Sequence, residues 1–135
     1  MSEKVLEIKN LCKSYGKRKI INDLNMTVFK GDVYGFLGAN GEGKTTTIRM
    51  ITSLIRSDSG EILINEKSVI KNRDQAIKNI GAMVEAPKFY ENLSGYENLK
   101  LMAKLIDGTS DKDIDKLLEL VGLKDRGKDK FASYS

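Results

Sequence analysis

The stretch GANGEGKTTT, from Gly38 to Thr47, has the residue types and spacing of a phosphate-binding loop. Positions 38 to 45 match G-x-x-x-x-G-K-[ST] at every fixed position. Glycines let successive backbone N–H groups point inward at a helix N-terminus, which makes a site for an anion. In this pattern Lys44 reaches the terminal phosphates and the Thr45 hydroxyl ligates Mg²⁺. The loop therefore predicts nucleotide binding through Gly38, Ala39, Asn40, Gly41, Glu42, Gly43, Lys44, Thr45 and Thr46.

The segments on either side of the loop predict the elements that position it. VYGFLG, residues 33–38, is a short apolar run, as expected for a strand buried on both faces. After the loop, apolar residues recur at helical spacing, namely Ile48, Ile51, Leu54 and Ile55. Strand, loop and helix in this order are typical of a parallel α/β sheet. The chain is therefore predicted to have an α/β fold of the P-loop NTPase class.

Further strands are predicted before Pro87 and helices after it. Alternating apolar residues indicate strands within 4–11, 24–32 and 57–65, and the apolar run 79–85 indicates another buried strand. A first helix has an apolar face of Tyr96, Leu99, Ala103 and Ile106. A second begins at Ser110 as N-cap with Asp113 three residues on and ends before Gly122. Its apolar stripe is Ile114, Leu117, Leu118 and Val121.

Composition excludes several kinds of site. The chain has no histidine, which removes Ser–His and Cys–His catalysis and imidazole metal sites. Cys12 is the single cysteine, so we expect a small buried side chain and no thiolate cluster. The net charge of +4 is scattered, which favours an ordinary surface over a nucleic-acid groove. Glu66, after an apolar strand, is interpreted as a turn carboxylate and not a metal ligand.

No signal peptide or bilayer-spanning run is expected, so the chain should be soluble and reach a membrane through a partner.

Four stretches together resemble the nucleotide-binding subunit of ABC transporters: LCKSYGKRKI with the glycine loop, SGEILINEKSV, IGAMVEAPKFYENLSGYENLKL and FASYS. The resemblance covers essentially the whole chain. It implies an ABC-type nucleotide-binding domain with a small antiparallel β subdomain and RecA-like core in residues 1–87. Residues 88–135 would be the start of a helical subdomain, so the domain would be truncated.

The same resemblance implies roles for residues outside the loop. Tyr15 would stack on adenine; the alternative is a tyrosine of the core or of a turn. Glu85 stands where most of the family has Gln, and it would ligate Mg²⁺ and open a loop facing the membrane subunit; the alternative is an ordinary loop carboxylate. Glu85 with the aromatic residues Phe89 and Tyr90 is similar to bacterial exporters of bacitracin- and lantibiotic-like peptides.

The resemblance also implies what these 135 residues lack. Tyr134 and Ser135 would be the first two residues of the signature motif, and the catalytic glutamate and switch histidine would lie beyond Ser135. We therefore expect no catalytic residue here, and a chain that by itself binds ATP with Mg²⁺ without hydrolysing it.

The whole subunit is expected to be an ATPase that drives peptide export at the cytoplasmic face of the bacterial membrane. The loop from Glu85 to Tyr90 would contact a transmembrane permease. A second nucleotide-binding subunit would complete a dimer with ATP at the interface, and no nucleic acid is expected as a partner. The alternative is a non-catalytic nucleotide-binding module or a soluble ABC protein acting on ribosomes, which would need more basic character or tandem domains.

Overall fold

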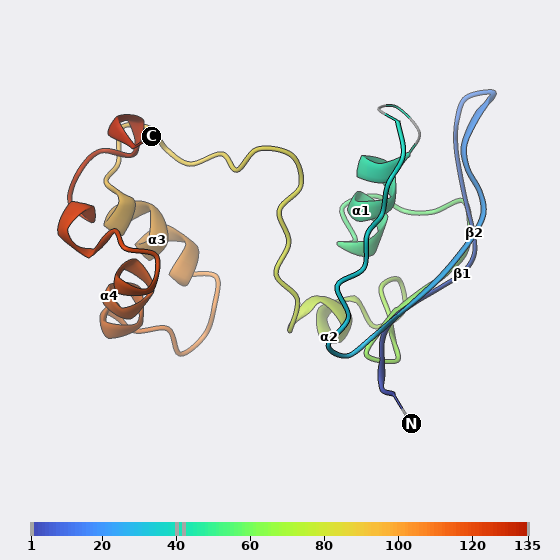
Figure 1. Cartoon of the computed structure of the whole chain (residues 1–135), viewed down its shortest axis with the longest axis horizontal. Coiled ribbons are helices and arrows are strands. Elements are labelled where there is room, and N and C mark those ends of the chain that lie inside the picture. The colour runs from blue at the N-terminus through green and yellow to red at the C-terminus, as the bar shows by residue number, and fades with distance from the viewer. Residues whose placement is uncertain (1, 40, 42, 135) are drawn as a thin grey trace. The chain divides into compact units, whose positions relative to one another are not determined.

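The computed structural model describes residues 2–39, 41 and 43–134 and divides into two compact units, Met1–Ala86 and Pro87–Ser135. The four strands belong to the first unit, and the second is built from helices (Figure 1). The finer assignment of residues 1–87 to a β subdomain with a P-loop core, and of 88–135 to a helical subdomain, stays a prediction.

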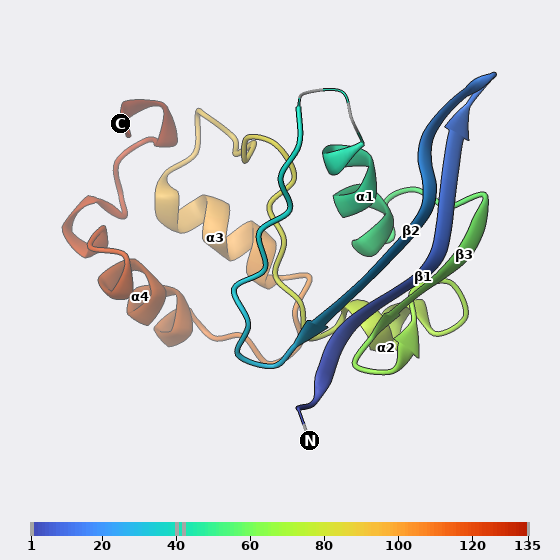
Figure 2. The same ribbon diagram turned by 45° about the vertical axis from the view of Figure 1, so that its right-hand side comes forward.

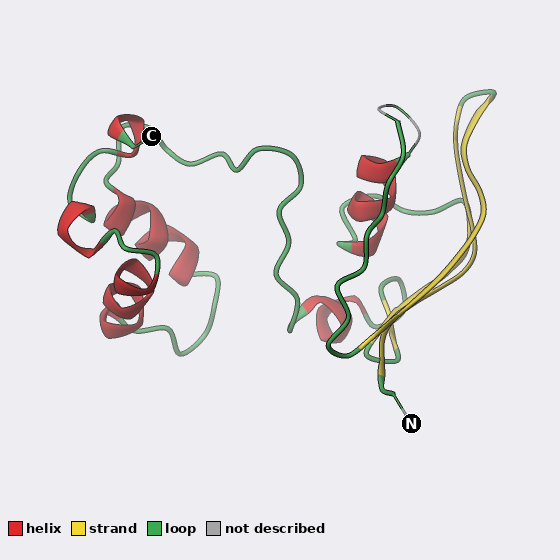
Figure 3. Cartoon of the chain, in the orientation of Figure 1, coloured by secondary structure: helices red, strands yellow, loops and turns green. Residues whose placement is uncertain are grey.

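A four-stranded antiparallel sheet in the order β2-β1-β3-β4 forms the framework of the first unit. Figure 2 shows β2, β1 and β3 side by side, and Figure 3 shows the strands in yellow. The turn between the last two strands contains Asn65 and Glu66, which both have positive φ values, 46° and 63°. Left-handed backbone at both central residues suits the twist of a two-residue hairpin turn. Glu66 is therefore a turn carboxylate, as predicted. The strands are β1 (Lys4–Tyr15), β2 (Arg18–Phe29), β3 (Ser59–Ile64) and β4 (Lys67–Ser68).

The core of the first unit joins one face of this sheet to two helices, α1 (Lys44–Ile51) and α2 (Arg73–Ile77). Met50 from α1 and Ala76 from α2 are each 1% exposed and belong to the same apolar cluster as the strand residues. Burial of this apolar surface fixes α1 against the hairpin of β1 and β2. The strand and loop members of the cluster are Ile8, Leu11, Ile21, Met26, Ile62, Ile64 and Val69.

Two predicted buried strands, 33–38 and 79–85, are irregular segments in the structure, so these predictions are wrong for this chain. Val33 is fully exposed, Leu37 is 93% exposed and Met83 is 70% exposed. A strand needs a neighbour that satisfies its backbone N–H and C=O groups. Among the described residues, neither segment pairs with any of the four strands. Their apolar composition predicts burial, but the described part of the chain supplies no ladder partner.

Both predicted helices of the second unit are present, as α3 (Gly95–Ala103) and α4 (Asp111–Leu120). The α4 boundaries confirm Ser110 as N-cap and Gly122, with φ 73°, as the residue that ends the helix. Ile114 and Leu118 are each 4% exposed, so they form the buried part of the predicted stripe. The first helix is shorter than predicted, because it ends at Ala103 and leaves Ile106 63% exposed. Two short 3-10 turns follow, η1 (Lys124–Arg126) and η2 (Phe131–Ser133).

Capping boxes begin both helices of the second unit. At α3 the Ser94 N–H donates to Glu97 Oε2 at 2.7 Å, and the Glu97 N–H donates to Ser94 Oγ at 3.1 Å. At α4 the Ser110 N–H and hydroxyl both donate to Asp113 Oδ2, at 2.9 and 2.6 Å. These bonds favour the charged carboxylates, so the pKa values of Glu97 and Asp113 lie below their ordinary range. The boxes satisfy N–H groups that the helices themselves leave free.

None of the helices formed by the described residues is long and apolar enough to cross a bilayer.

Candidate functional site

The glycine loop begins in the irregular segment after β2 and ends at the N-terminus of α1. Gly43 is the N-cap of α1 with φ 92°, and Gly41 has φ 84°, both in the left-handed region that side chains other than glycine rarely occupy. Gly43 also lies close to β2, because a Cβ there would be 2.5 Å from Ile21 Cδ1. The loop is therefore seated directly on the hairpin. Asn40 and Glu42 lie outside the described residues.

The Lys44 ammonium is folded back over the loop. Its Nζ donates to the Gly38 carbonyl and to the Ala39 carbonyl, the latter at 2.6 Å. The three predicted residues Gly38, Ala39 and Lys44 thus meet at one point. A phosphate oxygen is a charged acceptor and would bind this ammonium more strongly than the two neutral carbonyls do.

The first turn of α1 has backbone N–H groups that the helix itself does not pair, and it presents an exposed hydroxyl. Among the described residues, no acidic side chain lies in this first turn to offset the positive end of the helix dipole. The three threonines differ in burial. Thr47 is fully buried, and its hydroxyl donates to the Gly43 carbonyl at 2.8 Å, whereas Thr45 is exposed and Thr46 is half-buried. Thr47 therefore holds the start of the helix, and Thr45 is available to a ligand.

Tyr15 lies at the tip of the β1–β2 hairpin, where it pairs with Arg18 across the turn. Its side chain is 51% exposed, which excludes the interpretation as a core residue. Gly16, with φ 58°, makes the turn that follows. Lys13 Nζ lies 5.5 Å from the Tyr15 ring centroid. The ring is therefore accessible, and its stacking role stays a prediction.

Asp58, before β3, is bonded to the end of β1 that carries Tyr15. The Ser14 N–H donates to Asp58 Oδ2 at 2.6 Å, and Lys13 Nζ lies 3.3 Å from Asp58 Oδ1. The Ser14 hydrogen bond and then the Lys13 contact hold the pKa of Asp58 below its ordinary value. The sequence analysis did not predict Lys13 or Asp58 as neighbours of this strand end. Lys13 could have been indicated, because residues two apart on a strand lie on the same face, but no local pattern indicates Asp58.

Glu85 is paired with α1. Arg49 Nη2 donates to Glu85 Oε1 at 2.6 Å, and the two side chains are partly exposed. Glu85 has φ 62°, an uncommon backbone conformation for a residue other than glycine. Arg49 follows Thr45 by four residues, so both lie on the same face of the helix. The sequence analysis did not predict a role for Arg49, although its spacing of four residues after Thr45 could have indicated that it lies on the same helix face. The pairing brings Glu85 to the helix that carries the loop.

The aromatic residues after Pro87 have different environments within the second unit. The Phe89 ring lies 5.0 Å from the Phe131 ring and is half-buried. Tyr90 is 69% exposed, and its N–H donates to Asn98 Oδ1 at 2.9 Å. Phe89 therefore packs within its own unit, and Tyr90 offers the accessible ring.

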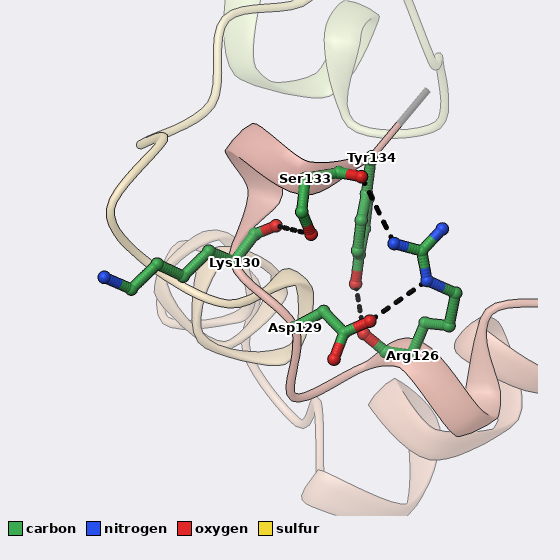
Figure 4. Close-up of polar contacts among 5 residues, drawn as sticks. All are labelled: Arg126, Asp129, Lys130, Ser133 and Tyr134. Carbon is green, nitrogen blue, oxygen red and sulfur yellow. Dashed lines mark hydrogen bonds and ion pairs between the residues drawn. The ribbon is translucent and has the colours of Figure 1, made fainter.

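The segment before Tyr134 is held by Arg126 (Figure 4). The Tyr134 hydroxyl donates to the Arg126 carbonyl at 2.6 Å, and Arg126 Nη2 donates to the Ser133 carbonyl at 3.2 Å. The Arg126 guanidinium lies 5.2 Å from the Tyr134 ring centroid, and its Nε donates to Asp129 Oδ2 at 3.0 Å. Tyr134 is thus fixed through its hydroxyl, its ring and the preceding carbonyl. The predicted signature-motif partner Ser135 lies outside the described residues.

The residues predicted to hold a metal offer hard oxygen donors. Among residues 2–39, 41 and 43–134, no group of three or more His, Cys, Asp or Glu side chains could hold a metal ion. Mg²⁺ is commonly bound by one or two protein oxygens together with substrate phosphates. The exposed Thr45 hydroxyl and the Glu85 carboxylate, which is paired with Arg49 of the same helix, are oxygen donors of this kind, and their role as Mg²⁺ ligands stays a prediction.

Comparison with known proteins gives consistent matches. Residues 21–135 match the family model described as ABC transporter. The chain is 50% identical over 131 residues to the uncharacterized ABC transporter ATP-binding protein YhcH of Bacillus subtilis (strain 168). It is 44% identical over 131 residues to the bacitracin transport ATP-binding protein BcrA of Bacillus licheniformis. Both alignments cover 97% of this chain and 43% of the relative, so the chain spans less than half of their length.

A solved structure described as the ATP binding subunit of an ABC transporter has a similar fold. The TM-score is 0.82 at 28% identity, and the match covers 97% of this chain and 56% of that chain. The likeness confirms the predicted fold class, including SGEILINEKSV as part of the antiparallel sheet.

Proposed function

The chain belongs to the ABC transporter family, and from that premise we propose that it binds ATP with Mg²⁺ as part of a transporter's ATPase subunit. The single observation that supports this most directly is the folded glycine loop, in which Lys44 closes over the Gly38 and Ala39 carbonyls. The loop is seated on β2 through Gly43 and continues into a helix with no acidic residue in its first turn. This arrangement supports a preformed anion site.

Each residue of the site has a proposed role. Residues 38–46 surround the phosphates with backbone N–H groups, and Lys44 supplies the positive charge. The Thr45 hydroxyl and the Glu85 carboxylate hold Mg²⁺, which neutralises phosphate charge when bound. Tyr15 stacks on adenine at the hairpin tip. The exposure of Thr45, Glu85 and Tyr15 supports these roles.

The relatives support a proposal for the transported substrate and the partners of the whole subunit. Since BcrA is described as a bacitracin transport protein, we propose that the whole subunit drives export of an antimicrobial peptide. The segment from Glu85 to Tyr90 would contact a transmembrane permease at the cytoplasmic face of the membrane, and a second nucleotide-binding subunit would complete the ATP site. Cysteine at position 90 should cross-link to the permease in the assembled transporter. Cross-links from this position to the second nucleotide-binding subunit alone would contradict this contact.

Calorimetric titration of the purified chain with MgATP tests nucleotide binding. Lys44→Ala should abolish binding, because residues 38–46 contain no other cation. Lys71→Ala, an exposed lysine in the turn after β4, is the matched control and should bind as the parent does. Tyr15→Ala should weaken binding by about 1–3 kcal/mol, the usual value of base–aromatic stacking. If Lys44→Ala binds MgATP as tightly as the parent, the loop assignment is wrong.

A further inference from the structure

The Lys13 ammonium covers one face of the Tyr15 ring. Its Nζ lies 5.5 Å from the ring centroid, within the range of about 6 Å in which a cation is attracted to an aromatic face. The Lys13 side chain is only 16% exposed, whereas Tyr15 is 51% exposed. The cation is therefore held against the protein, while the ring keeps an accessible surface.

Asp58 fixes this lysine. Its carboxylate pairs with Lys13 Nζ at 3.3 Å and accepts the Ser14 N–H at 2.6 Å. The Asp58 N–H in turn donates to the Cys12 carbonyl at 3.0 Å. Three consecutive residues of β1 are thus bonded to one aspartate. The hairpin end therefore has a defined conformation before any ligand binds.

We propose that Lys13 is a positioning residue for the purine base of a nucleotide, and that it acts through Tyr15. This rests on the stacking role proposed for Tyr15 above. Both faces of an aromatic ring carry negative charge density, which opposes direct stacking of two rings. The Lys13 cation over one face of the Tyr15 ring offsets that repulsion, and the opposite face stays available for the base. A ring that is already fixed also loses less freedom when the base binds.

The test compares two ligands, ATP and inorganic tripolyphosphate, each titrated calorimetrically into the full chain with Mg²⁺. Lys13→Met should weaken ATP binding about two- to fivefold, the lower range for a cation–π contact, and leave tripolyphosphate binding unchanged. Lys13→Arg should restore ATP binding, since guanidinium also binds aromatic faces. Lys9→Met is the matched control, because Lys9 is on the same strand and pairs with Glu7. It should change neither affinity.

A double-mutant cycle separates the possible outcomes. If Lys13 acts through Tyr15, then Lys13→Met in a Tyr15→Ala background has no further effect on ATP binding. An independent loss there, or an equal loss for tripolyphosphate, would place Lys13 on the phosphates and overturn the inference. If Tyr15→Ala weakens ATP binding and Lys13→Met does not, only this inference fails. If Tyr15→Ala has no effect, the proposed stacking role fails as well.

Asp58→Asn provides a second variant in case Lys13→Met does not fold. Asparagine retains an oxygen for the Ser14 N–H and removes the charge that holds Lys13. ATP binding should weaken in the same direction by a smaller factor, with tripolyphosphate unaffected. The chain contains no tryptophan, so Tyr15→Trp gives a single fluorescent reporter at the ring position. The quenching of this tryptophan fluorescence by ATP should decrease when Asp58→Asn is combined with Tyr15→Trp. Unchanged quenching and unchanged affinity would both contradict the proposal.

Discussion

Arg49 Nη2 donates to Glu85 Oε1 at 2.6 Å, which attaches Glu85 to the helix that follows the glycine loop. The two side chains are 40% and 61% exposed. An exposed pair of this kind contributes only ~0.2–1 kcal/mol. Glu85 is therefore held at α1 by a contact weak enough to be exchanged for another cation.

Glu85→Gln should weaken binding of Mn²⁺, used as a paramagnetic substitute for Mg²⁺, in the presence of ATP. Arg49→Met should strengthen it by up to about fivefold, because the ion then no longer competes with a pair worth ~0.2–1 kcal/mol. Electron paramagnetic resonance of free Mn²⁺ measures both affinities. Glu66→Gln, in the β3–β4 turn, is the control and should have no effect. A weaker Mn²⁺ affinity in Arg49→Met would show that the pair supports the metal site and does not compete with it.

Gly43→Ala should destabilise the chain more than Gly41→Ala. Both residues have left-handed backbone, which costs about 1–2 kcal/mol for alanine. A Cβ at Gly43 would also overlap Ile21 Cδ1 at 2.5 Å, whereas at Gly41 it would meet nothing within 4 Å. Urea unfolding of the two variants gives the difference. Equal losses would mean that Ile21 moves aside without cost and that the loop is not seated firmly on β2.

The capping-box carboxylate Glu97 should make the second unit less stable in acid. Its folded-state pKa lies below the ordinary value of 4.5, so its stabilising effect is complete above that pH. The effect is lost as the pH falls below 4.5 through the lower folded-state pKa. The stability difference between the parent and Glu97→Gln should therefore be constant at neutral pH and shrink in acid. Thermal unfolding across this range measures it, with Glu91→Gln as a control in the same unit. A difference that is independent of pH would contradict the role of the charge.

A polypeptide of these 135 residues should bind MgATP and release no phosphate above the rate of its Lys44→Ala variant. Phosphoryl transfer requires an aligned water and charge stabilisation around the phosphate. The sequence contains no histidine, and the described residues form no group of three or more His, Cys, Asp or Glu side chains that could hold a metal ion. Phosphate release at saturating MgATP, followed with a coupled assay, measures the rate. Turnover clearly above the variant would mean that these residues already contain a catalytic group.

Local patterns predicted the local features of this chain. The loop with its following helix, the capping box at Ser110 and the glycine that ends α4 depend on residues within a few positions of each other. Such features are determined by backbone conformation and neighbouring side chains, so spacing alone reveals them. The short helix α2 was missed because five residues carry too little periodicity.

Features that depend on distant residues were predicted poorly. The pairs Arg49–Glu85 and Ser14–Asp58 join segments that are 36 and 44 residues apart, and no local pattern indicates them. The segments 33–38 and 79–85 show the opposite error. Their composition favours strands, but a strand forms only where another chain segment completes its hydrogen bonds, and composition contains no information on that partner.

In the proposed roles, the β1–β2 hairpin connects the residue that would contact the base of a nucleotide to the loop that would contact its phosphates. Ile20 and Ile21 of β2 contact the loop at Gly43, and the same ribbon carries Tyr15 at its tip. Because both groups belong to one pair of hydrogen-bonded strands, these strands would set the distance between the position of the base and the position of the phosphates. An insertion in the turn at Gly16 would alter that interval while leaving both contact groups chemically intact. The pairing register of β1 and β2 would then determine which length of ligand fits, independently of the side chains that contact the ligand.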